Sequence, residues 1–124
     1  MIKLGFVSAV VEDLGFEAVV DLAAELGYDC VEMLCWPVGK AERRYAGVTH
    51  VDVTNLDDKL VKEIRGYCDK KGVSISSLGY YPNYLEDSPQ APGYAEHFLK
   101  VIDASARLGI GIGSRSAAIS RLSK

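Results

Sequence analysis

The chain has 124 residues, of which 48% are hydrophobic and 25% charged, and it carries a net charge of −3 at pH 7. This balance excludes disordered, collagen-like and coiled-coil chains and is typical of a globular domain. A chain of this length can bury roughly two thirds of its unfolded surface, so one domain with a core is expected. The acidic balance argues against nucleic acid as the main partner.

Cysteine usage predicts a reducing compartment. The cysteines, Cys30, Cys35 and Cys68, are three in number, and the first apolar run, residues 4–11, is short and ends at Glu12 and Asp13, unlike a secretory leader. Cys30 and Cys35 lack the spacing of a zinc site, so we expect both to be buried as small hydrophobic residues. The interpretation is a cytoplasmic protein, and no apolar stretch is long enough to cross a membrane.

Strands and helices are predicted to alternate along the chain. The predicted strands cover residues 3–10, 30–36 and 73–81, and the predicted helices cover residues 16–26, 56–71 and about 92–108. Each helix is followed by a glycine, Gly27, Gly72 or Gly109, that we expect to end it. Asn55 is expected to cap the second helix, and a fourth strand begins after Gly109.

The connections differ in length at the two ends of the predicted sheet. Those from helix to strand are tight, whereas those from strand to helix span residues 37–54 and 82–91. Alternating strands and helices imply parallel pairing with right-handed crossovers. Long loops gathered at one end of such a sheet are where these folds place their chemistry.

The polarity of the strands favours a barrel over a flat doubly wound sheet, whose strands would be apolar on both faces. Two sets of residues with polar members are each predicted to share one strand face: Glu32, Leu34 and Trp36, and Ser74, Ser76, Leu78 and Tyr80. Polar groups facing a barrel axis explain both sets. The predicted fold class is therefore α/β, a partial (β/α)8 TIM barrel of about three and a half βα units with parallel strands.

Two segments carry a resemblance to a known family. They are residues 30–50, with Cys30-Val31-Glu32 and Cys35-Trp36-Pro37 through to Thr49-His50, and residues 77–83, Ser77-Leu78-Gly79-Tyr80-Tyr81-Pro82-Asn83. On these motifs the chain resembles the sugar phosphate isomerase/epimerase family of xylose-isomerase-like TIM barrels over about residues 2–112. We therefore expect residues 1–113 to form the N-terminal half of such a barrel and residues 114–124 to be an atypical basic tail, frameshifted or disordered.

The resemblance implies that the complete form is a metal-dependent isomerase or epimerase, or a related lyase, that acts on a sugar, sugar phosphate or polyol. A divalent metal (Mn, Mg, Co or Zn) is held there by carboxylates and a histidine of the later strands, beside paired glutamates that move a proton. None of those positions falls in this chain. We expect it to hold no catalytic residue, metal ligand or cofactor, and to be inactive alone while supplying one wall of the sugar pocket.

Five residues are candidate substrate contacts: Glu32, Trp36, His50, Tyr80 and Asn83. Glu32 is predicted in mid-strand, where a carboxylate must be hydrogen-bonded or paired, and a structural role is the equal alternative. Trp36 and Tyr80 end strands where an aromatic face suits a sugar ring, although aromatic residues also fill cores. The alternative for His50 is ordering of its own loop, and for Asn83 it is a turn after proline.

Three further features are given structural interpretations. Lys40, Arg43 and Arg44 suit a phosphate, but Glu42 interrupts them and a solvated surface is the default. The glycines at 109, 111 and 113 imitate a dinucleotide fingerprint, but the first of them ends a helix rather than a strand. His97, on the third helix, is expected to be solvated.

Three other functions remain as alternatives. Unpaired strand edges would let a non-catalytic half-barrel self-associate into a homo-oligomer. A small α/β binding module would need a complete sheet with a ligand at its switch point. An endonuclease of the same superfamily would need a histidine-rich metal cluster and a basic face, and the chain has two histidines and a net negative charge.

Overall fold

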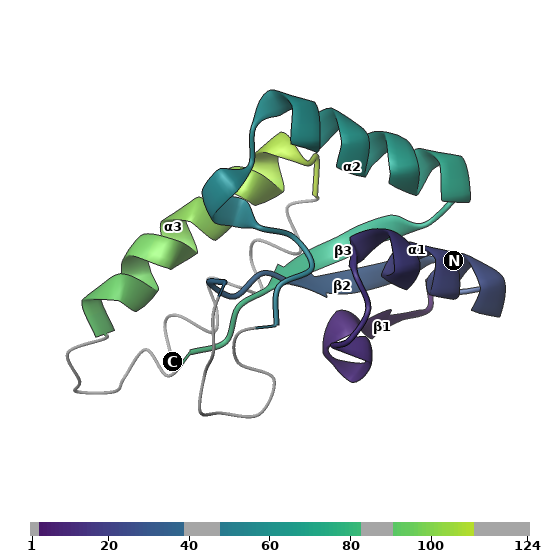
Figure 1. The fold of residues 1–124 in the computed structure, drawn as a ribbon, viewed down its shortest axis with the longest axis horizontal. Coiled ribbons are helices and arrows are strands. Elements are labelled where there is room, and N and C mark those ends of the chain that lie inside the picture. Colours follow the sequence, from purple (N-terminus) through teal and green to yellow (C-terminus); the bar gives the residue numbers. More distant parts are fainter. Residues whose placement is uncertain (1–2, 39–47, 83–90, 111–124) are drawn as a thin grey trace.

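The computed structural model describes residues 3–38, 48–82 and 91–110. Three parallel strands form one sheet in the order β1-β2-β3, and three helices alternate with them (Figure 1). The strands are β1 (Gly5–Val7), β2 (Cys30–Leu34) and β3 (Ser74–Gly79), and the helices are α1 (Phe16–Leu26), α2 (Asp58–Lys71) and α3 (Ala91–Arg107). The alternating parallel arrangement predicted from the sequence is confirmed, while the predicted tail of residues 114–124 lies outside the described residues.

The first two helices end where the sequence predicts. Gly27 and Gly72 adopt left-handed backbone conformations with φ of 80° and 69°, which a residue without a Cβ enters at little cost. The amide of the residue after each glycine, Tyr28 or Val73, then donates to a carbonyl in the last turn of the helix. These caps provide hydrogen bonds for carbonyl groups that a helix end would otherwise leave unpaired, and the chain turns directly into the next strand.

The predicted start of α2 is wrong by two residues. Asp57, not Asn55, is the N-cap, because its Oδ1 accepts a hydrogen bond of 2.8 Å from the Leu60 amide. Asn55 instead ends the short 3-10 turn η2 (Val53–Asn55), where its side-chain amide donates to Asp52 at 2.8 Å. A carboxylate at the cap also favours the positive end of the helix dipole, which the neutral Asn55 would not.

The first strand is shorter than the predicted 3–10. It ends at Val7, and the chain then enters the 3-10 turn η1 (Ser8–Val11). At this point the hydroxyl of Ser8 accepts a hydrogen bond of 2.9 Å from the amide of Leu34 on β2. A side chain thus replaces the backbone carbonyl that a longer strand would have offered.

The core lies between the sheet and the helices, and alternate residues of β2 reach into it. Val31, Met33 and Cys35 are each fully buried in the core, which also contains residues of all three helices. Figure 1 shows α2 and α3 on the upper side of the sheet, and α1 packs on β2 and α2. Glu32 and Leu34, between these positions, point to the opposite face of the sheet.

A β-bulge corrects the predicted faces of the third strand. The register pairs Val31 with Ile75 but Glu32 with Ser77, so Ser76 is an extra residue in β3. Beyond this point the alternation is reversed, and Leu78 pairs with Met33 on the helix-covered face. Leu78 and Tyr80 therefore belong to the core. They do not share a polar face with the serines, because one inserted residue exchanges the two faces of a strand.

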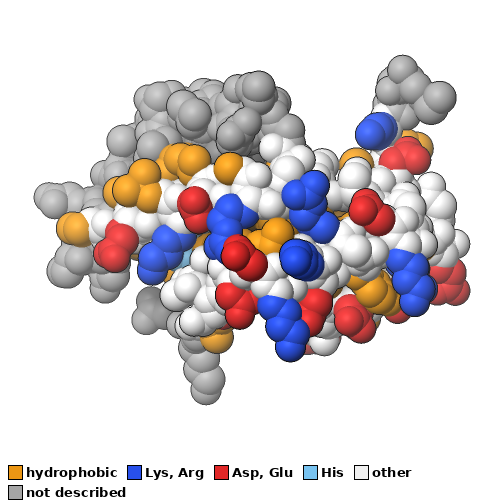
Figure 2. Space-filling model, turned by 90° about the horizontal axis from the view of Figure 1, so that it is seen from above, with side chains coloured by type: hydrophobic (Ala, Val, Ile, Leu, Met, Phe, Trp, Pro, Cys, Tyr) orange, Lys and Arg blue, Asp and Glu red, His pale blue; other side chains and the backbone are white. Residues whose placement is uncertain are grey.

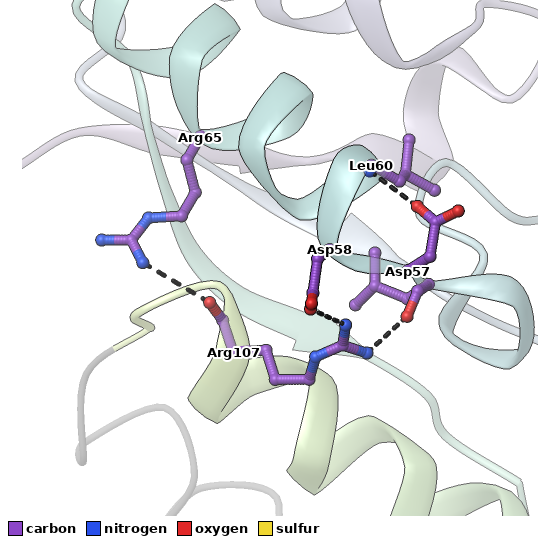
Figure 3. Close-up of polar contacts among 6 residues, drawn as sticks. Asp57, Asp58, Leu60, Arg65 and Arg107 are labelled. Atoms are coloured by element: carbon purple, nitrogen blue, oxygen red, sulfur yellow. Dashed lines mark hydrogen bonds and ion pairs between the residues drawn. The ribbon is translucent and has the colours of Figure 1, made fainter.

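An arginine joins α3 to the start of α2. The guanidinium of Arg107 donates to the Leu56 carbonyl and, at 3.0 Å, to a carboxylate oxygen of Asp58 (Figure 3). Arg65 returns the contact by donating to the Arg107 carbonyl at 3.5 Å. Because two nitrogens of one planar group are used, this contact fixes the orientation of the two helices as well as their separation.

On the outward surface beside α2, positive and negative charges are mixed. Figure 2 looks onto this side and shows basic and acidic side chains intermixed over it.

Along the described residues no helix is both long and apolar enough to cross a membrane. The three cysteines are unpaired and buried, which confirms the predicted burial of Cys30 and Cys35.

The close approach of β1 to β2 gives a test of the fold. A Cβ added at Gly5 would lie 2.4 Å from the Cys30 carbonyl oxygen, so Gly5→Ala forces the two strands apart. We expect it to lower the free energy of unfolding by about 1–3 kcal/mol in urea melts. The matched control is Gly66→Ala on α2, where nothing lies within 4 Å; it should raise stability by about 0.5–1 kcal/mol. Equal melts for Gly5→Ala and the natural chain would contradict the observed strand contact.

Candidate functional site

Three of the candidate residues, Trp36, His50 and Tyr80, lie where β2 and β3 end, and the segment that carries His50 is bonded to the end of β2. After β2, Cys35 forms an isolated antiparallel bridge with Thr49. The His50 amide donates to the Leu34 carbonyl at 2.9 Å, and the Thr49 hydroxyl donates to the carbonyl of Trp36. The segment that carries His50 is therefore held by hydrogen bonds at the carboxyl end of the central strand. This is the end at which folds with alternating parallel strands and helices place their functional sites.

Trp36 and Tyr80 are brought together, and a histidine from α3 completes the cluster. The Trp36 and Tyr80 rings meet edge to face at 5.1 Å between centroids, and Tyr80 meets His97 in the same way at 4.5 Å. Tyr80 is 6% exposed, whereas Trp36 is half-buried. We refer to Trp36, Tyr80 and His97 as the aromatic cluster.

His97 is not solvated, contrary to the prediction. It is 7% exposed, and its Nε2 lies 2.7 Å from the Cys35 carbonyl oxygen, so this nitrogen is the donor. A pattern in the sequence could have shown this, because His97 stands at helical spacing from the buried Val101, Ala104 and Leu108. A histidine on the apolar face of a helix is buried with it and must find an acceptor there.

Glu32 has the hydrogen-bonded environment that the sequence predicts for a carboxylate in mid-strand. Its Oε1 accepts a hydrogen bond of 2.8 Å from the Ser77 hydroxyl, and both residues are half-buried. The bulge in β3 creates this pair by placing Ser77 rather than Ser76 opposite Glu32. Burial raises the pKa of the Cys35 thiol, and the negative charge of Glu32 adds to the increase. Cys35 is therefore an inert core thiol.

His50 is buried with one ring nitrogen unpartnered. It is 8% exposed, and its Nδ1 lies 2.7 Å from the Ser8 hydroxyl, while Nε2 has no hydrogen-bond partner among residues 3–38, 48–82 and 91–110. Burial lowers the pKa of His50, and the backbone carbonyls of Leu14 and Val11 oppose this in part. The ring is therefore neutral at physiological pH. Ser8, which sequence reasoning missed, is the polar exception in the apolar run of residues 4–11.

The structure brings only some of the candidates together. Trp36 and Tyr80 are in contact, but Glu32 is bonded to Ser77 and His50 to Ser8. The remaining candidate, Asn83, lies outside the described residues, as do Lys40, Arg43 and Arg44. Two cavities, of about 200 and 320 Å³, lie at the other end of β3 around Cys68 and Ser74, and none of the candidates lines them.

The described residues do not fit the metal that the resemblance implies. Over residues 3–38, 48–82 and 91–110, no group of three or more His, Cys, Asp or Glu side chains is placed to hold a metal ion. Glu32 and His50, two candidates whose side chains are of metal-ligand types, each form a hydrogen bond with a serine. The chemistry available from this part of the chain is hydrogen bonding and aromatic contact.

Comparisons with known proteins agree with this architecture. The sequence profile of the xylose isomerase-like TIM barrel family matches residues 20–115. The fold resembles the crystal structure of a xylose isomerase domain-containing protein from Salmonella typhimurium, with a TM-score of 0.58 and 15% identity. That match covers 87% of this chain and 34% of the other, so this chain spans about a third of the solved protein's length. No curated protein matches the chain.

Burial of a neutral His50 predicts a dependence of stability on pH. The ordinary histidine pKa is 6.5, and burial lowers it in the folded state. As the pH falls below this value, the unfolded chain binds a proton that the folded ring resists, so acid favours unfolding. We expect the free energy of unfolding to decrease between about pH 7 and pH 5.5, by at most about 1.4 kcal/mol per pH unit. His50→Gln should flatten this slope in urea melts; an unchanged slope would contradict the buried neutral ring.

Proposed function

Because the chain belongs to the xylose isomerase-like TIM barrel family, we propose that it forms part of the sugar-binding wall of a metal-dependent sugar isomerase or epimerase. The observation that carries the proposal is the position of the aromatic cluster at the carboxyl ends of β2 and β3, two strands that also carry the hydrogen-bonded Glu32–Ser77 pair. In barrels of this kind the ligand lies at that end. Sugars offer both an apolar ring face and many hydroxyl groups, which this mixture of side chains would suit.

Each proposed contact has a distinct role. Trp36 would pack its indole on the apolar face of the sugar. Tyr80 would fix the orientation of the indole through the edge-to-face contact between their rings. Glu32 has a second carboxylate oxygen besides the one that Ser77 occupies, and this oxygen would accept from a sugar hydroxyl. His50 would form a hydrogen bond to the sugar through Nε2, which has no partner among the described residues. Asn83 would add an amide after β3.

The metal and the paired acids would come from other strands of a complete barrel. A divalent metal there supplies polarisation of the sugar carbonyl. The residues described in this chain bind and orient the sugar, and no proton transfer is assigned to them. We also propose a cytoplasmic location, because the three cysteines are unpaired.

A single tryptophan makes sugar binding measurable. Trp36 is the only tryptophan in the chain, so its fluorescence reports on this site alone. We expect D-fructose, D-tagatose, D-psicose or one of their phosphates to change the emission in a saturable way. Glu32→Gln should then weaken the Kd about tenfold, since a hydrogen bond to a charged group contributes about 1.5–3 kcal/mol. Glu63→Gln, an exposed carboxylate on α2, is the control and should leave the Kd unchanged. No saturable change with any of these sugars would refute the proposal.

Turnover gives a separate test. We expect the isolated chain, supplied with Mn²⁺ and the same ketoses, to give no isomerised or epimerised product in sugar analysis by NMR, because the described residues form no metal centre. Product formation that Glu32→Gln abolishes would overturn this expectation and make Glu32 a catalytic residue.

Self-association is a second candidate function. Within the described part of the chain, β1 and β3 each pair with β2 alone, so the outer edge of each is left without a strand. Leu4 and Val10, on either side of β1, are 62% and 65% exposed. Such an edge favours pairing with another chain. A dimer in sedimentation equilibrium that Leu4→Lys dissociates would support this candidate, and a monomer at all concentrations would exclude it.

A further inference from the structure

The position of Ser8 determines which nitrogen of His50 carries the proton. Ser8 is fully buried at the end of β1, and two groups lie within hydrogen-bond distance of its hydroxyl oxygen. The Leu34 amide donates to it at 2.9 Å, and Nδ1 of His50 lies 2.7 Å away. Since an amide can only donate, one lone pair of the hydroxyl is already used.

The two neutral forms of His50 differ in how many buried polar groups they leave unpaired. If Nε2 carries the proton, the Ser8 hydroxyl donates to Nδ1, and the only group without a partner is Nε2–H. If Nδ1 carries it, Nδ1–H donates to Ser8, and both the hydroxyl proton and the Nε2 lone pair lack partners. Leaving a buried polar group without a hydrogen bond is unfavourable, so the first form, which leaves fewer such groups, is favoured.

We propose that Ser8 is a positioning residue: its hydroxyl donates to Nδ1 of His50 and so keeps the proton on Nε2, where it serves as a hydrogen-bond donor to an acceptor oxygen of the substrate. This inference rests on the proposed function, because it deepens the part that His50 plays in it. It restricts the group opposite Nε2 to a carbonyl, hydroxyl or phosphate oxygen with a free lone pair. Nε2 is buried in this structure, so contact with a substrate requires the ring or the residues that cover it to move.

The tautomer can be observed directly. The chain has two histidines, so a long-range proton–nitrogen NMR spectrum of labelled protein contains two ring patterns, and His50→Gln identifies one of them by removing it. At about pH 7.5 we expect the His50 pattern to show a protonated Nε2 and an unprotonated Nδ1. The reverse pattern would overturn the inference.

Variants at Ser8 test its role. Ser8→Ala removes the donor to Nδ1, so we expect the His50 nitrogens to shift toward a mixture of the two tautomers while the His97 pattern stays as it was. Ser8→Thr keeps a hydroxyl and should restore the natural pattern. Ser105→Ala removes another buried serine hydroxyl, one that donates to the Val101 carbonyl on α3, and should leave His50 unchanged. An unaltered His50 pattern in Ser8→Ala would overturn the role of Ser8, and if that variant does not fold, the natural chain and Ser8→Thr still decide.

Addition of D-fructose separates this inference from the proposed function. We expect the sugar to shift the Nε2–H resonance of His50, with the tautomer unchanged. If the tautomer is as stated but no sugar shifts the resonance, the donor to substrate is overturned and the effect of Ser8 on the ring stands. If sugar binds but the proton is on Nδ1, the proposed function stands and this inference is overturned.

Discussion

The carboxyl end of the central strand is buried, and this single fact places demands on the rest of the structure. Leu34 and Cys35 are 2% and 0% exposed, so their backbone groups cannot be hydrated and need partners from the protein. Ser8 accepts from the Leu34 amide, the His50 amide donates to the Leu34 carbonyl, and the Cys35 amide donates to the Gly79 carbonyl. The fourth partner is His97 of α3, which donates to the Cys35 carbonyl. The partners therefore come from four separate parts of the chain.

The hydrogen bonds to the backbone groups at the end of β2 also assemble the candidate site. The segment around His50 is held against β2 by its own backbone, and α3 is drawn in by the hydrogen bond of His97, which in turn orients Tyr80 against Trp36. Groups already fully used by the backbone, such as the Thr49 hydroxyl and Nε2 of His97, are therefore structural. Nε2 of His50 has no partner in the part of the chain that the structure describes, and a ligand can use an unpaired group of this kind.

The same geometry accounts for how the chain relates to its family. Three parallel strands with helices on one face are a segment of a barrel wall, and the solved protein of similar fold extends beyond the matched portion, which is 34% of its chain. The opposite face of β2 and β3 carries the Glu32–Ser77 pair, where a barrel would have its interior. Polar pairs of this kind are satisfied within the wall itself, which lets the segment keep a carboxylate half-buried without a metal.

The sequence by itself determined the order and type of the elements, the parallel pairing and the ends of the first two helices, because amphipathic spacing and terminal glycines act over a few residues. It also placed Trp36 at a strand end and His50 in the long connection that follows this strand. Only the tertiary structure decided that Asp57 caps α2, that Ser76 is an extra residue in β3, and that Ser8 and His97 hold the end of β2. The reason is distance along the chain: Ser8 and His97 meet β2 from 26 and 62 residues away, and no local pattern records which buried backbone group needs a partner.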